Sequence, residues 1–211
     1  MTTFQGIPAA AFGFYAELQE NNNREWWQEH KDSYQSLVRD PLASLLAELE
    51  PRFGQGRLFR PNRDIRFSLD KSPYKTAQGA FASVQEGVGY YLQVSAEGLL
   101  VGGGYHSHSP AQLARYRNAV DASGTGESLR HIVDGVAAAG FAVEGERLKT
   151  VPRGYDRSHP RAELLKHKSL AASVDLGQPA WLGTPAAVGE ISGLWDQLRP
   201  LVDWVGRHAA P

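Results

Sequence analysis

The sequence predicts an α+β fold: a single domain with N-terminal helices, a central, mostly antiparallel sheet, and C-terminal helices packed on that sheet. Apolar residues repeat at helical spacing in the first and last thirds of the chain and alternate with polar residues in the middle third. The length of 211 residues fits one domain, whose core we expect from about residue 12 to residue 204.

Local signals place the first helices. An apolar repeat over residues 12–18 predicts a helix. Asn22, followed three residues later by Glu25, fits a capping box, so we expect a second helix to begin there. Asp40 and Pro41 fit an N-cap and a first helical residue, which predicts a bend or a restart of the helix at Pro41.

The middle third predicts strands. Residues 58–68 contain an apolar and polar alternation typical of a half-buried strand, and residues 80–85 form a second candidate. Residues 90–95 and 99–105 flank Gly98 and predict a hairpin. Three consecutive glycines in the second arm indicate a bulge or a close approach by another group.

Helices return in the last third. Ser109 and Gln112 fit a capping box, and we expect Gly124 to Gly126 to separate that helix from the next. Further along we expect short strands within 141–151, a loop over 152–160, a short helix over 161–167, and a last helix that begins at Thr184-Pro185 and is kinked at Pro200.

Composition excludes several classes of protein. The chain has no cysteine, which removes disulfide scaffolds, thiol nucleophiles and cysteine-bound metals. It has no apolar run of the ~18 residues that a membrane span requires and no secretory signal, so we expect a soluble, cytoplasmic protein. Phosphate-loop, dinucleotide-binding, zinc-protease and nucleophile-elbow motifs are also missing from the sequence.

Charge is unevenly distributed along the chain. The net charge is −1, yet residues 57–75 carry +4 and residues 147–168 carry +5, which leaves −10 for the rest. Two basic segments in an acidic body are typical of an anion-binding site. The alternative is a pair of solvated basic loops that form ion pairs with acidic helices nearby.

The first basic segment holds the densest set of chemically capable side chains. If residues 64–68 are extended, Asp64 and Arg66 lie on one face and can pair. An arginine held by a carboxylate is a rigid fork suited to phosphate or carboxylate. The alternative is a structural ion-pair network that fixes a loop.

The second basic segment contains a loop rich in proline and glycine. Arg153, Tyr155 and His159 can bind a ligand or move protons. The alternative role of His159, directly before Pro160, is local capping. His106 and His108 could supply two metal ligands on a strand, but no third ligand is identifiable and no metal site is predicted.

Six motifs occur in this order along the chain: Asn21–Trp27, Arg63–Thr76, Tyr90-Tyr91, Gly102–Tyr105, Pro152–Tyr155 and His159-Pro160. Together they resemble the uncharacterised family called domain of unknown function 2461, found in bacteria and fungi. The resemblance covers nearly the whole chain and implies one α+β domain, without an activity or cofactor to carry over. The chain departs from the family pattern at Leu69, where we expect lysine.

We therefore expect a binding or catalytic pocket for a phosphate-bearing small molecule or nucleotide. If chemistry occurs, His159 or Asp70 is the expected proton carrier. A nucleic-acid-binding module, with Trp26 or Tyr74 stacked on a base, and a non-enzymatic interaction protein are the alternatives. The expected ligand-binding residues are Arg63, Asp64, Arg66, Lys71, Tyr74, Lys75, Arg153 and Tyr155.

Overall fold

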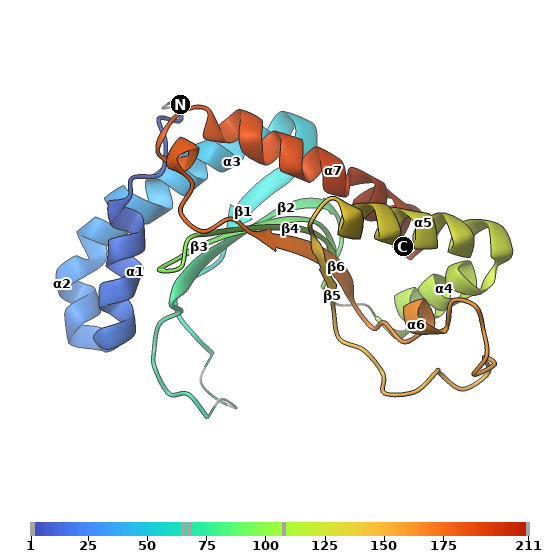
Figure 1. The fold of residues 1–211 in the computed structure, drawn as a ribbon. Helices are drawn as coiled ribbons and strands as arrows, with labels where there is room; N and C mark the ends of the chain where they lie inside the picture. Colours follow the sequence, from blue (N-terminus) through green and yellow to red (C-terminus); the bar gives the residue numbers. More distant parts are fainter. Residues whose placement is uncertain (1–2, 65, 67–68, 107–108, 210–211) are drawn as a thin grey trace. The chain divides into compact units, whose positions relative to one another are not determined.

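The computed structural model describes residues 3–64, 66, 69–106 and 109–209, and it confirms the α+β fold (Figure 1). Six strands form one antiparallel sheet in the order β1-β2-β3-β4-β6-β5. The strands are β1 (Gln55–Leu58), β2 (Ala77–Gln85), β3 (Val88–Ser95), β4 (Leu99–Tyr105), β5 (Ala142–Glu144) and β6 (Leu170–Asp175). The helices are α1 (Ala10–Glu20), α2 (Arg24–Tyr34), α3 (Asp40–Phe53), α4 (Pro110–Asp121), α5 (Ser123–Ala138), α6 (Ala162–Leu165) and α7 (Ala187–His208), with a π turn η1 (Gln35–Arg39) and a 3-10 turn η2 (Ala180–Gly183).

The contacts divide the chain into two compact units. Unit 1 comprises Met1–Ala82, Tyr91–Val101 and Asp175–Ser192, and unit 2 comprises Ser83–Tyr90, Gly102–Val174 and Gly193–Pro211. The division passes through β2, β3 and β4, so each unit holds one part of these strands.

The helical N-terminal region of unit 1 is confirmed, with corrections at two helix boundaries. Asn23, and not Asn22, caps α2, because its side chain accepts the N–H of Trp26 at 2.9 Å. At Pro41, where a bend or a restart of the helix is predicted, the π turn η1 gives way to α3, but Asp40 is not an N-cap because its φ and ψ of −68° and −43° are helical. The helix continues through η1, in which the Asp40 N–H bonds to the Gln35 carbonyl, and this wider turn accommodates a proline that cannot donate a regular helical bond.

The strand predicted over residues 58–68 is wrong for the described residues 59–64 and 66, which belong to no strand. β1 ends at Leu58, and a long loop leads to β2. In that loop the Asp64 carboxylate accepts the N–H of Arg66 at 3.2 Å, a local turn that competes with strand pairing. Ile65, Phe67 and Ser68 lie outside the described residues.

The central strands and their hairpin are confirmed. β3 and β4 are joined at Gly98, whose φ of 135° favours glycine. The predicted close approach at the glycines of β4 is found at Gly103 in unit 2, where a Cβ would lie 3.2 Å from Val202 and 3.4 Å from Leu198, both on α7. β6 was not predicted; it pairs with β5 in the register Ala142↔Ser173.

Unit 2 contains the predicted capping box at α4, in which Ser109 accepts the N–H of Gln112. The predicted separation of α4 from α5 at Gly124 to Gly126 is wrong, because the break lies at Ala122 and both glycines belong to the first turns of α5. Gly126 allows a close contact instead: a Cβ there would lie 2.0 Å from the Val120 carbonyl oxygen.

Candidate functional site

The loop between β1 and β2 carries the predicted anion motif (Figure 1). Residues near its two ends are joined by backbone hydrogen bonds. The Arg63 N–H donates to Pro73 O at 2.9 Å, and the Lys75 N–H donates to Pro61 O at 2.8 Å. This bridge closes the loop at its base.

Asn22 fixes the same base from the helical layer of unit 1. Its Nδ2 donates to Tyr74 O at 2.9 Å, and its Oδ1 accepts the Tyr74 N–H at 3.1 Å. Tyr74 is 5% exposed, and its ring stacks on Trp27 with centroids 4.2 Å apart. The structure therefore gives Tyr74 an anchoring position, and its predicted contact with a ligand remains a prediction.

Both carboxylates of the motif form ion pairs with its arginines. The Asp64 oxygens accept Arg66 Nε at 3.0 Å and Arg66 Nη2 at 2.7 Å, which is a two-pronged pair. These hydrogen bonds hold the pKa of Asp64 below its ordinary value. Asp70 pairs with Arg63 and accepts the N–H of Ser72 at 2.9 Å.

The pairing of Asp64 with Arg66 is confirmed, although it is formed through a turn and not through a strand. The arginine side chain is 76% exposed and the aspartate side chain 44% exposed. Asp70 is held by Arg63 and by the backbone N–H of Ser72. Its predicted role in proton transfer remains a prediction.

The remaining cations of the segment lie at its ends and along the loop. Arg57, Arg60 and Lys71 are exposed, and Lys75 is half-buried. Lys75 Nζ lies 5.6 Å from the centroid of the Phe59 ring, within the range of a cation–π contact.

The second predicted group, Arg153, Tyr155 and His159, lies in unit 2. Arg153 is exposed. The Tyr155 hydroxyl donates to Asn118 Oδ1 at 3.3 Å, and burial raises the pKa of this tyrosine. The two basic segments thus belong to different units.

Both ring nitrogens of His159 have polar partners. Nδ1 accepts the Arg161 N–H at 3.0 Å, so Nε2 carries the proton that faces Asp121 Oδ1 at 3.2 Å. This arrangement is the one expected of a histidine that holds a loop. Its predicted role as a proton carrier remains a prediction.

Arg161, which the sequence did not single out, is the most deeply placed cation of the second segment. It is 9% exposed, and its guanidinium donates to Val120 O at 2.7 Å and to Asp121 O at 2.8 Å. It therefore satisfies carbonyls at the C-terminal end of α4. Only the fold brings these residues together, since about 40 positions separate them in sequence.

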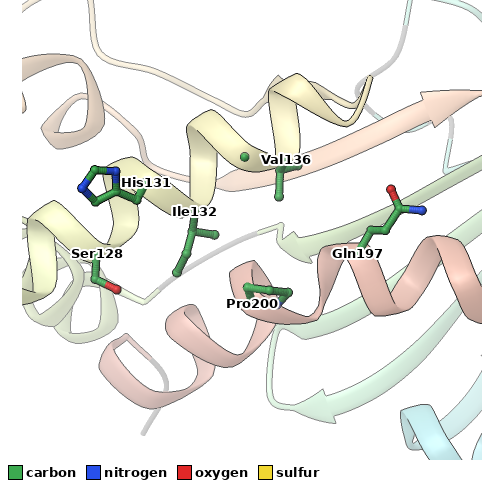
Figure 2. A pocket seen from close by; sticks show the side chains of 7 residues that line it. Ser128, His131, Ile132, Val136, Gln197 and Pro200 are labelled. Atoms are coloured by element: carbon green, nitrogen blue, oxygen red, sulfur yellow. The ribbon is translucent and has the colours of Figure 1, made fainter.

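Two hollows are found in unit 2. One, of about 380 Å³, includes His159 and Arg161 in its lining. The other, of about 430 Å³, lies between α5 and α7, and Figure 2 shows Ile132 and Val136 on the α5 side and Pro200 on the α7 side. Neither hollow is lined by a residue of the basic segment 57–75.

No metal site emerges from the part of the chain that the structure describes, because no three His, Cys, Asp or Glu side chains are grouped there. His106 is exposed at the end of β4, and His108 lies outside the described residues. Within the same described ranges, no helix combines the length and apolar character needed to span a membrane.

Comparison with known proteins gives one match. The family described as "Conserved hypothetical protein (DUF2461)" matches residues 10–204, which confirms the resemblance inferred from the motifs. No curated protein and no solved structure matches the chain.

Proposed function

The chain belongs to the DUF2461 family, and from its own geometry we propose that it binds a phosphate-bearing small molecule on the basic segment 57–75 of unit 1. The segment carries a net charge of +4 in a protein of net charge −1. Its two carboxylates are engaged with Arg63 and Arg66. The excess positive charge therefore attracts anions to this surface.

The observation that carries the proposal is the two-pronged pair of Asp64 and Arg66. Two parallel hydrogen bonds fix the plane of the guanidinium, while the arginine side chain stays 76% exposed. A guanidinium with a fixed plane offers phosphate oxygens a geometry that a mobile lysine does not.

The anchoring of the loop supports the same function. The Asn22 hydrogen bonds, the Trp27–Tyr74 stack and the bridge at Asn62 and Tyr74 order the base of the loop before any ligand arrives. Less conformational entropy is then lost on binding.

We also propose that the protein is located in the cytoplasm, which cell fractionation would check.

Isothermal titration of the purified protein with inorganic phosphate, pyrophosphate and ribose 5-phosphate, at low and moderate salt, tests the proposal. We expect one of these compounds to bind, and Arg66→Ala to weaken that binding about tenfold, since hydrogen bonds to charged groups are among the stronger ones. Arg130→Ala is the matched control, because Arg130 is an exposed arginine that pairs with Glu127 in unit 2.

Binding that is equally strong in Arg66→Ala and in the wild type would remove Arg66 from the site. If none of the three compounds binds, the proposal is rejected, and a role of the ion pairs in stabilising the loop is favoured. In that case Arg66→Ala lowers the melting temperature and no phosphate compound raises it.

A further inference from the structure

One face of the sheet in unit 1 carries aromatic rings that are only half-buried. Gly56 of β1 lies against α3, since a Cβ there would be 2.9 Å from Leu46 Cβ. The next residue, Arg57, therefore points to the opposite face. Along β2, Ala80 and Ala82 are buried, whereas Phe81 between them is half-buried and on that opposite face.

Phe59 and Tyr91 lie on this same face. A Cβ added at Gly79 would lie 2.7 Å from the Tyr91 hydroxyl and 3.0 Å from Phe59 Cδ2. The centroids of the two rings are 6.2 Å apart. Phe59, Phe81 and Tyr91 are called the aromatic face below, and all three rings are half-buried.

Two cations of the basic segment lie over rings of the aromatic face. The Arg57 guanidinium carbon lies 5.7 Å from the centroid of Phe59 and 5.9 Å from that of Phe81. Lys75 Nζ lies 5.6 Å from the centroid of Phe59. Arg57 and Lys75 are the two ends of segment 57–75, so the aromatic face lies beside the two ends of the proposed anion-binding segment.

A polar group with hydrogen-bonding capacity completes the face. Gln93 follows Tyr91 by two positions in β3, and its Oε1 accepts the tyrosine hydroxyl at 2.8 Å. This bond orients the amide beside the rings. The face thus combines flat apolar surface, a hydrogen-bonding edge and adjacent positive charge.

We propose that the aromatic face takes the base of a nucleotide whose phosphate is held by the basic segment, an inference that rests on the function proposed above. Nucleobases stack on aromatic rings and on guanidinium planes, and every base has such a face. Phosphate is the group that Arg57 and Lys75 complement by charge. The ligand class is therefore a nucleoside phosphate and not a sugar phosphate alone.

A single nucleotide fits these observations better than a nucleic-acid strand. The aromatic face has three rings, enough for one or two bases, and the net charge of −1 opposes a long polyanion. A nucleic-acid strand would require positive charge along a longer path on the protein surface.

The test compares ribose 5-phosphate with the four nucleoside 5′-monophosphates by isothermal titration. Stacking on a protein ring changes affinity by about tenfold or more, so we expect at least one nucleotide to bind about tenfold more tightly than ribose 5-phosphate. Phe81→Leu should reduce nucleotide affinity to that of ribose 5-phosphate and leave ribose 5-phosphate binding unchanged. Val84→Ala is the control, since Val84 is exposed on the same strand outside the aromatic face.

Equal affinity for ribose 5-phosphate and all nucleotides overturns this inference and leaves the proposed function intact. Failure of every phosphate compound overturns both. Tight binding of a single-stranded oligonucleotide with a steep salt dependence, and no binding of mononucleotides, also overturns it. If Phe81→Leu fails to fold, Gly79→Ala serves instead, because its methyl group displaces Tyr91 and Phe59 and should give the same selective loss of nucleotide binding.

Discussion

Removal of the Asn22 side chain should release the base of the long loop in unit 1. Asn22→Ala deletes the two hydrogen bonds to the N–H and C=O of Tyr74, at 3.1 and 2.9 Å, in a partly buried setting. With a net value of 0.5–1.5 kcal/mol for each bond, the free energy of unfolding should fall by about 2 kcal/mol. The melting temperature should drop by about 4–8 °C, given ~2–4 °C per kcal/mol in a domain of this size.

Urea denaturation measures the global loss, and hydrogen exchange at the Tyr74 amide measures the local one. That amide should exchange faster in Asn22→Ala, because its acceptor is gone. Asn21→Ala is the matched control: Asn21 is exposed and its side chain bonds only within its own helix end, to Glu17 O at 2.9 Å. Equal stabilities of the two variants, or unchanged exchange at Tyr74, would refute the anchoring role of Asn22.

Unit 2 offers three further tests. Gly126→Ala should destabilise the protein by at least ~2 kcal/mol in urea denaturation, because its Cβ would lie 2.0 Å from Val120 O and 2.4 Å from Arg161 Nε. Gly124→Ala, with nothing within 4 Å of its Cβ, should instead stabilise by about 0.5–1 kcal/mol; a loss of stability there would contradict the assignment. Arg161→Lys should cost about 1–3 kcal/mol in the same assay, since the guanidinium bonds the two carbonyls at the end of α4 from two separate nitrogens, Nε and Nη2, in a rigid fork that lysine lacks. Wild-type stability would argue against this capping role. Burial lowers the pKa of His167 below 6.5 in the folded state, so the unfolded state binds its proton first and stability should fall as pH drops below 6.5; His167→Gln should flatten the melting temperature between pH 7 and pH 5, and an unchanged slope would refute this.

The sequence predicts elements well where the signal is local. The Ser109–Gln112 capping box needs only residues three apart, and it is found at α4. The strand expected over 58–68 failed because alternation does not reveal that the Asp64 carboxylate binds the N–H two residues on. β6 escaped prediction because its centre, Ala171 to Ser173, consists of small residues with weak strand preference.

In the candidate site, too, contacts between residues close in sequence were predicted and contacts between distant residues were not. The Asp64–Arg66 pair was predicted, since the two side chains are two positions apart. The aromatic face was not, because Phe59, Phe81 and Tyr91 come from different segments and meet only when the strands pair. The hydrogen bonds between Asn22 and Tyr74 span 52 positions, and no local pattern indicates them.

The π turn η1 sets the rotation of α3 about the helix axis relative to α2, because the three elements form one continuous helical segment. In a regular α-helix each residue turns the chain by about 100°, so one residue more or less rotates everything that follows by that angle. The wider turn of η1 takes up one residue more than a regular α-helical turn, so the apolar side chains of α3, such as Leu42, Leu45 and Leu49, lie in the core together with Tyr34 of α2. A regular α-helix through all the residues of Gln35–Arg39 would rotate α3 by about 100° and turn these leucines toward solvent without changing any of them. Deletion of one residue from Gln35–Arg39 would instead allow a regular turn and keep the leucines in the core. The wide turn is therefore matched to the number of residues between the two apolar faces.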